Sequence, residues 1–211
     1  MNFGLIISYV IAGFLMIMIF TINYNVGFSN QEVTTTLIKK THSQSVQDMI
    51  IHDIPKIGYE QYDKVGTIIS DHGSVFVKAD KHEISYYSDL SNDGTYEMVT
   101  WKYDPDKTPD HAQNPHVNTL YRTVGSDVTE ITIGITNFEI RYYDEYGNVD
   151  TTSTAPMSTP ITGSALDDIV QIEIEFEMQN DYTLNYRASD PERYVTTTWE
   201  KRFSPVNLRQ D

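Results

Sequence analysis

The stretch of sequence that decides the fold is FGLIISYVIAGFLMIMIFTI, residues Phe3–Ile22, which contains no charged side chain. An α-helix rises about 1.5 Å per residue, so this stretch would span about 30 Å, the thickness of a bilayer's hydrocarbon core. Its hydroxyl residues, Ser8 and Thr21, are of the mildly polar kind that a membrane helix tolerates. The stretch therefore predicts a retained transmembrane helix within residues 1–22.

Two other interpretations of this stretch are a cleaved signal peptide and a buried core helix. A signal peptide has an apolar region of about 7–15 residues, a preceding positive charge and a following small-x-small cleavage site. The apolar run here is longer, no Lys or Arg precedes it, and no such site follows it. Soluble helices are rarely apolar on every face, so the sequence favours a membrane anchor over both alternatives.

Residues 23–58 are predicted to continue the helix as an amphipathic segment. Gly27 lies among β-leaning residues and is expected to strain or locally unwind the helix. Beyond it, apolar residues recur at three- and four-residue multiples, and this pattern assigns Lys39 to the polar face. Pro55 disfavours helical geometry in the residue before it, so the helix is expected to end near Ile54. The apolar face comprises Val33, Leu37, Val46, Met49 and Ile50.

Residues 59–211 predict an antiparallel β domain, so the fold class is α+β. Stretches rich in Val, Ile, Thr and Tyr alternate here with turn signals. The clearest is Ile169–Met178, where apolar residues alternate with polar ones, as in a strand with one buried face. Residues 104–116 and 151–163 are rich in Pro, Thr or Asp and predict loops. The other predicted strands cover residues 66–69, 74–78, 83–88, 96–103, 117–124, 128–135, 137–144 and 194–203.

The composition excludes several classes of function. The chain has 30 acidic and 15 basic residues, a net charge of −15, and no cysteine. A soluble part this acidic argues against binding to nucleic acid or to anionic lipid. Without cysteine there is no disulfide, thiolate metal site or thiol catalysis. Neither a nucleophile elbow nor a phosphate loop or dinucleotide fingerprint occurs, so no enzyme activity or small-molecule substrate is expected.

Six short stretches of the sequence, given at the end of this paragraph, occur in the same order as similar stretches in a known protein family. This order resembles the type IV pilin-like proteins, especially the J-type minor pseudopilins of type II secretion and the related W-type minor pilins. The resemblance covers most of residues 1–208 and implies a long N-terminal helix, first half transmembrane, packed on an antiparallel β-sheet. The stretches are MIIHDIPKIGY (49–59), ISYYSDLSNDGTYEMVTWKY (84–103), Leu120-Tyr121-Arg122, ITNFEIRYYDEYG (135–147), the Val/Ile-rich residues 169–176, and FSPVNL (203–208).

The N-terminus departs from the family pattern. Family members carry a short basic leader that ends in Gly, and a Glu at the fifth mature position that is thought to neutralise a neighbouring subunit's N-terminal amine. Residues 1–4 contain no basic residue, and a cut after Gly4 would place Tyr9 at the fifth position. Three explanations stay open: a degenerate leader, a sequence that starts late, and a pilin-like domain that never enters a filament.

The stretch DLSNDG is similar to the first half of an EF-hand-like calcium loop. Asp89, Ser91 and Asp93 occupy the first three ligand positions, and Glu97 occupies the ninth. Thr100 stands where the bidentate Glu is expected. Asp, Asn and Gly also favour a simple chain reversal, so a bare hairpin turn is favoured over a calcium site. No other cofactor is expected.

Small residues in the apolar stretch predict a helix-packing surface. Gly4, Ser8 and Ala12 fall at four-residue steps and would let another helix approach closely. A passive role for these residues in lipid is the alternative.

Glu173, Glu175 and Glu177 lie on one face of a predicted strand, about 7 Å apart, a spacing that could seem catalytic. This pattern is more typical of the solvent side of an amphipathic strand, or of a charge stripe that faces a partner.

These expectations favour a structural, pilin-like subunit anchored in the bacterial inner membrane as a single-pass protein with its C-terminal domain extracytoplasmic. Its partners would be other pilin-like or membrane subunits, contacted through the helix, and membrane lipid. As a J-type resemblance it would sit near the tip of a secretion pseudopilus. The alternative is a single-pass accessory or scaffold subunit of a larger membrane complex that has recruited a pilin-like domain. A calcium-dependent adhesion module is a third interpretation.

Overall fold

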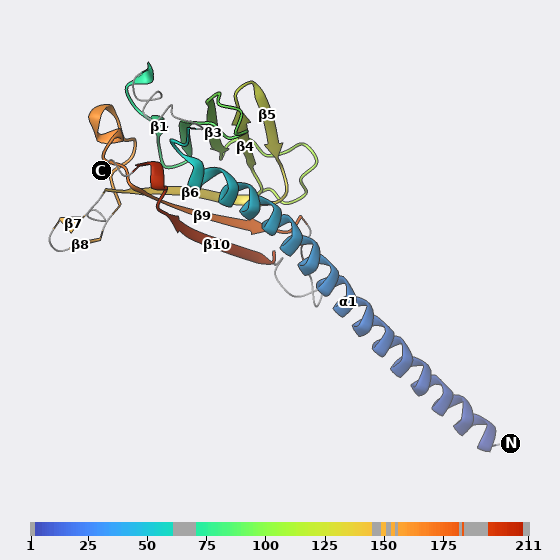
Figure 1. Cartoon of the computed structure of the whole chain (residues 1–211). Helices are drawn as coiled ribbons and strands as arrows, with labels where there is room; N and C mark the ends of the chain where they lie inside the picture. The colour runs from blue at the N-terminus through green and yellow to red at the C-terminus, as the bar shows by residue number, and fades with distance from the viewer. Residues whose placement is uncertain are drawn as a thin grey trace.

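A long helix, α1, carries a β domain at its C-terminal end (Figure 1). The computed structural model describes residues 3–60, 71–144, 149–150, 153–154, 156–181, 183 and 194–208. The predicted strand at residues 66–69 and the predicted turn at residues 145–148 lie outside the described residues. A long N-terminal apolar helix followed by antiparallel sheets confirms the α+β layout.

α1 runs without interruption from Phe3 to Asp53. The break predicted near Gly27 is therefore wrong. A single glycine costs a helix only about 1 kcal/mol and, unlike proline, keeps the backbone N–H that continues the hydrogen-bond ladder. The helix ends where the sequence predicts, because Pro55 lies in the short 3-10 helix η1, Ile54–Lys56, that follows it.

Five strands form one antiparallel sheet in the order β1-β2-β3-β4-β5, each paired with its neighbour in sequence. In the register of this sheet, Ile84 lies opposite Trp101, and Tyr103 lies opposite Leu120. These side chains are buried, so one face of the sheet covers the core. The bounds are β1 Phe76–Ala79, β2 Glu83–Ser88, β3 Glu97–Asp104, β4 Thr119–Val124 and β5 Asp127–Ile131.

Three further strands form a second antiparallel sheet in the order β10-β9-β6. The central strand is the one that the alternation in Ile169–Met178 predicts, and its apolar residues are buried. The bounds are β6 Ile135–Tyr143, β9 Gln171–Gln179 and β10 Thr196–Phe203. Short elements lie between β6 and β9: β7 Val149–Asp150 and β8 Ser153–Thr154, which pair with each other, and the 3-10 helix η2 Gly163–Leu166. A further 3-10 helix, η3 Val206–Leu208, follows β10. β8 lies within residues 151–163, for which the sequence predicts a loop.

Gly134 separates β5 from β6, where the sequence predicts one strand over residues 128–135. It has a φ of +86°, and a Cβ at this position would lie 2.3 Å from the carbonyl oxygen of Gln179. Its own carbonyl oxygen accepts a hydrogen bond from the Gln179 N–H at 2.8 Å. The chain therefore leaves the five-stranded sheet at this residue and enters the three-stranded one.

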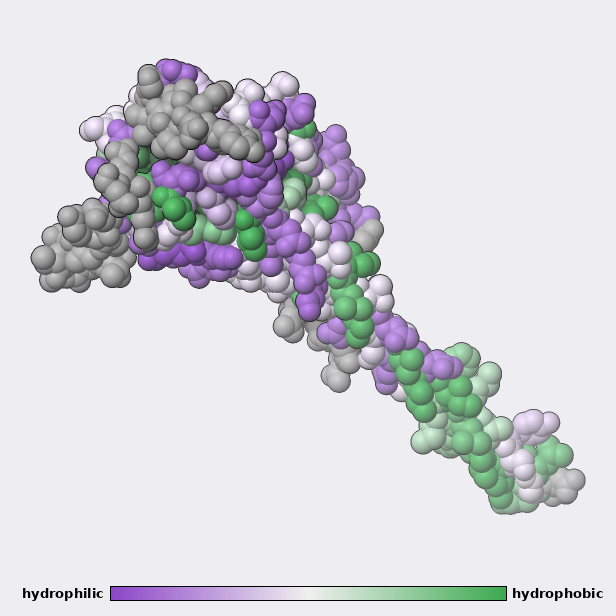
Figure 2. Space-filling view, viewed as in Figure 1, coloured by the Kyte–Doolittle hydropathy of each residue, from purple (hydrophilic) through white to green (hydrophobic). Residues whose placement is uncertain are grey.

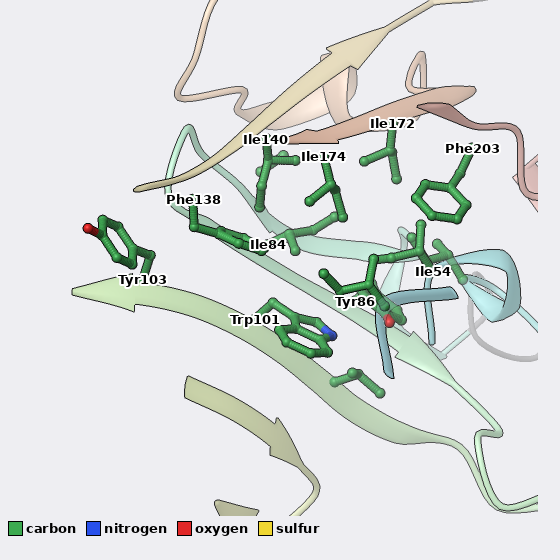
Figure 3. Close-up of a cluster of buried hydrophobic side chains, with 14 of the residues drawn as sticks. Ile54, Ile84, Tyr86, Trp101, Tyr103, Phe138, Ile140, Ile172, Ile174 and Phe203 are labelled. Atoms are coloured by element: carbon green, nitrogen blue, oxygen red, sulfur yellow. The ribbon is translucent and has the colours of Figure 1, made fainter. Parts of the chain in front are cut away.

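The core lies between the two sheets and the C-terminal end of α1 (Figure 3). The rings of Trp101, from β3, and Phe138, from β6, stack with centroids 6.3 Å apart. Ile54 of η1, directly after α1, lies in the same core, next to Phe203 of β10 (Figure 3). Because both sheets and the helix share one core, the position of α1 is set by the β domain.

Candidate membrane and assembly interface

The N-terminal half of α1 is an exposed apolar surface that projects away from the β domain (Figure 2). The large apolar residues between Phe3 and Ile22 are 48% to 74% exposed. In the described chain, α1 is the one helix long and apolar enough to cross a membrane, and its most apolar part is not buried inside the protein. The interpretation as a buried core helix is therefore wrong, whereas a signal sequence passes the same test of length and composition.

The three small residues Gly4, Ser8 and Ala12 lie on this exposed part of α1. The Ser8 hydroxyl donates a hydrogen bond to the Gly4 carbonyl oxygen at 2.9 Å, and Thr21 bonds in the same way to Ile17. Neither hydroxyl therefore needs a partner from outside the helix in lipid. No atom lies within 4 Å of the position that a Cβ on Gly4 would occupy. The surface is open to a neighbouring helix, and the packing role of these residues stays a prediction.

The opposite end of α1 is fixed to the five-stranded sheet by a buried ion pair. Asp53, the last residue of α1, is completely buried. Arg122 of β4 donates two hydrogen bonds to its carboxylate, from Nε at 2.6 Å and from Nη2 at 2.9 Å. The indole N–H of Trp101 donates a third at 3.1 Å. This bidentate, charge-assisted geometry fixes the direction in which the helix leaves the domain.

Tyr86 adds a neutral hydroxyl to this cluster. Its side chain is fully buried, and the hydroxyl has no hydrogen-bond partner in the described part of the structure. Burial, together with the Asp53 carboxylate, raises the pKa of Tyr86 well above its usual value. The hydrogen bonds from Arg122 to Asp53 raise the pKa of the arginine. Asp53 and Arg122 form the charge pair of the cluster, and the Nδ1 atom of His52, whose side chain is exposed, lies 3.1 Å from Asp53 Oδ1.

Lys39 fixes α1 to the three-stranded sheet at a second point. The side chain is buried, and its ammonium group donates a hydrogen bond to the carbonyl oxygen of Val195, next to the start of β10. Burial lowers the pKa of Lys39 to about 8, against the opposing effect of Glu177. Lys39 and Asp53 are separated by about 21 Å of helix, so α1 is held at both ends of its contact with the domain.

The sequence assigned Lys39 to the polar face of the helix, and this assignment is wrong. Val33 and Leu37, which were assigned to the buried face, are 57% and 59% exposed. The face that packs on the domain has the spacing of a helical stripe, but it begins with polar residues. Its members are Lys39, Ser43, Val46, Ile50 and Asp53.

The loop proposed to bind calcium folds onto its own backbone. The Asp89 carboxylate accepts hydrogen bonds from the N–H groups of Asp93 and Gly94, at 3.1 and 2.9 Å. The Glu97 carboxylate accepts bonds from the Leu90 N–H at 3.4 Å and from the Ser91 hydroxyl at 3.3 Å.

The remaining candidate ligand, Asp93, accepts a bond from the Thr95 N–H at 2.8 Å, and this bond lowers the pKa of its carboxyl. Within the described ranges, no three His, Asp or Glu side chains are grouped as metal ligands. Calcium binding by this loop stays a prediction, but the shape of the loop has an explanation without a cation.

The glutamates of β9 form an ion-pair network that the sequence did not reveal. Glu173 lies directly between Arg141 of β6 and Arg202 of β10 in the sheet register. Its carboxylate accepts hydrogen bonds from Arg141 at 3.0 Å and from Arg202 at 2.7 and 2.9 Å. Burial alone would raise the pKa of Glu173, but these bonds lower it below its usual value. Arg141 also bonds Glu175 at 2.6 Å, so the charged stripe stabilises the sheet itself.

No protein-family model matches the chain, and the searches of curated proteins and of solved structures returned no match.

Proposed function

We propose that this chain is a pilin-like structural subunit that is anchored in a membrane by the N-terminal half of α1. It would be a minor pseudopilin-type component of a type II secretion or type IV pilus-like assembly. One observation carries the proposal: a single continuous helix has an exposed apolar half and a second half that is fixed into a β domain. An assembly subunit needs this combination, because contacts made by the helix then determine where the domain lies.

The apolar half of α1 would associate with other helices in lipid. Lipid tails are as apolar as leucine, so packing between helices, rather than the hydrophobic effect, drives such association. Small residues permit the closest packing, which makes the face that bears Ser8 and Ala12 the expected contact surface. Gly4 extends this face in a chain that keeps its first four residues, whereas a cut after Gly4 leaves Ser8 and Ala12 to form it. The domain would then follow the helix as one body, because Lys39 and Asp53 fix it at two points.

A second candidate function is that of a single-pass accessory subunit in a larger membrane complex, with a recruited pilin-like domain. The observation that favours it is the absence of any acidic side chain between Phe3 and Gln31. In pilin-like filaments an acidic residue in this region is thought to neutralise a neighbour's N-terminal amine. A helix without an acidic residue in this region is suited to partners that do not place an N-terminal amine beside it.

Site-specific photo-crosslinking in native membranes tests the proposal. A photo-reactive residue at Ala12 should yield crosslinks to pilin-like subunits. The same residue at Val10, on the opposite side of the helix, is the matched control and should yield several-fold fewer. Crosslinks from Ala12 to a non-pilin membrane complex would favour the accessory subunit instead. Equal labelling of lipid from both positions, with no protein crosslinks, would contradict both functions.

A further inference from the structure

The two sheets have four edges, and two of these are covered by other parts of the chain. β1 is paired at Ala79 with Ile161, whose N–H donates to the Ala79 carbonyl oxygen at 2.9 Å. Along the outer edge of β6, the Ile140 N–H donates to Lys81, and the Tyr142 carbonyl oxygen accepts from Met157, both at 2.8 Å. These edges cannot accept another strand.

β5 and β10 form the other two edges, and the part of the chain that the structure describes leaves both of them open. Within the described ranges, β5 pairs only with β4, and β10 pairs only with β9. No other described backbone group bonds to either strand. An open edge presents a row of unpaired N–H and C=O groups that can accept a further strand.

The two open edges carry charges of opposite sign that can meet across a contact, and β10 also carries an exposed acidic residue, Glu200, whose carboxylate lies 3.5 Å from Arg141 of its own sheet. On β10, Lys201 is exposed, forms no ion pair with another described residue and lies with its Nζ 5.2 Å from the centre of the Phe203 ring. On β5, Asp127 is exposed and has no ion-pair partner among the described residues, and Glu130 makes a 3.5 Å contact with Lys107. A lysine on an edge discourages pairing with most strands, but it favours a strand that carries acidic residues.

We propose that β10 of one copy pairs with β5 of the next copy, so that neighbouring domains join into a continuous sheet. This inference rests on the proposed function, because it assumes that the copies are anchored in one membrane with their helices parallel. Two copies joined in this way still have one open β5 edge on one copy and one open β10 edge on the other. A head-to-tail contact of this kind adds further copies without closing on itself, which suits an assembly subunit.

Pairing between two identical edges is disfavoured for each strand. Two β5 edges would bring Asp127 and Glu130 against the same residues of the second copy, and like charges across a strand pair are destabilising. β10 starts next to the contact with Lys39 and ends near Ile54, so it runs in the same direction as α1 (Figure 3). A two-fold antiparallel pair of β10 strands would therefore point the two helices in opposite directions. Two chains anchored in one membrane in the same orientation cannot adopt that arrangement.

The absence of cysteine allows a direct test by disulfide crosslinking in membranes. The chain with both Val128→Cys and Thr198→Cys, each at an exposed position of an open edge, is oxidised in place. A ladder of dimers, trimers and longer species is expected. Each single variant should stay monomeric, because a single cysteine can only join two identical edges. The double variant Thr198→Cys with Ser164→Cys, an exposed residue of η2, is the matched control and should also stay monomeric.

A charge exchange sharpens the test. Lys201→Asp in the double-cysteine chain should weaken the ladder at least about fivefold, because it removes a favourable cross-strand charge pair of about 1 kcal/mol and sets like charges against each other. Adding Asp127→Lys should restore it. Dimers from a single-cysteine variant, or a monomeric double variant, would overturn the inference. If the double variant is monomeric while Ala12 still gives protein crosslinks, the edge pairing is wrong and the proposed function stands; if both fail, both are wrong.

Discussion

Arg122 on β4 donates two hydrogen bonds to the completely buried carboxylate of Asp53, the last residue of α1. This pair joins the membrane-directed helix to the β domain across 69 residues of sequence. Burying two charges is costly, and an apolar pair of the same shape is often as stable. We infer that the pair serves to orient the helix rather than to add stability, because its planar, bidentate geometry permits one orientation of the helix end.

Removal of one partner from this pair should be strongly destabilising. Asp53→Asn leaves the Arg122 guanidinium, whose side chain is 21% exposed, without its counter-charge, and the loss of hydrogen bonds between charged groups should cost about 1.5–3 kcal/mol. Urea unfolding of the detergent-solubilised chain measures this loss. Asp48→Asn, on the exposed side of the same helix, is the control and should change stability by less than about 0.5 kcal/mol. An equally small effect for Asp53→Asn would show that the pair is dispensable.

Among the glycines of the domain that the structure describes, Gly134 should be the least tolerant of substitution. Gly134→Ala combines a positive φ, which costs an alanine about 1–2 kcal/mol, with a Cβ that would lie 2.3 Å from the Gln179 carbonyl oxygen. Gly73 has a similar φ of +79°, but no atom lies within 4 Å of the Cβ that a substitution would add. Gly73→Ala therefore measures the cost of the positive φ without a steric contact. The difference in unfolding free energy between the two variants should be at least about 1 kcal/mol. Equal losses would mean that the steric contact relaxes at no cost.

Lys39 should give the protein a stability that rises with pH. Its pKa is about 8 in the folded chain, below the ordinary value of 10.5, so the folded state binds fewer protons than the unfolded state between these values. Stability must then increase as pH rises from about 8 to about 9.5, before tyrosine ionisation in the unfolded chain opposes it. Lys39→Met should abolish the slope, and Lys40→Met, at an exposed position, should leave it. A slope that persists in Lys39→Met would contradict the account of the helix contact.

The loop that begins at Asp89 should be stabilised by its carboxylate with or without calcium. Asp89→Ala removes two hydrogen bonds to backbone N–H groups, so it should cost about 1–3 kcal/mol. Melting temperatures of the parent chain and this variant, each measured in millimolar calcium and in chelator, separate the two roles. A calcium-dependent rise in the parent that the variant lacks would establish a metal site instead.

The periodic parts of the fold could be predicted from the sequence, because their signal is local. The uniform apolarity of Phe3–Ile22 and the alternation in Ile169–Met178 each depend on residues close together in the chain. Pro55 likewise places the helix end correctly.

The polar contacts of the candidate interface could not be predicted, because each depends on a residue far away in sequence. Lys39 is buried only because Val195 offers a carbonyl oxygen beside β10, and Asp53 only because β3 and β4 bring Trp101 and Arg122 to it. In the helix pattern alone, a lysine signals an exposed face. The stripe that continues from Lys39 to Asp53 at three- and four-residue spacing was the available clue.

The most direct test of the central claim is the intact mass of the chain extracted from native membranes, together with sequencing of its N-terminus. The account predicts a mature chain that retains the apolar half of α1, begins just after Gly4 or another glycine, and carries an added methyl group. A chain that begins at Met1 without a methyl group would contradict processing as a pilin-like subunit and favour the accessory subunit. A chain cut after Ile22 would contradict the membrane anchor itself.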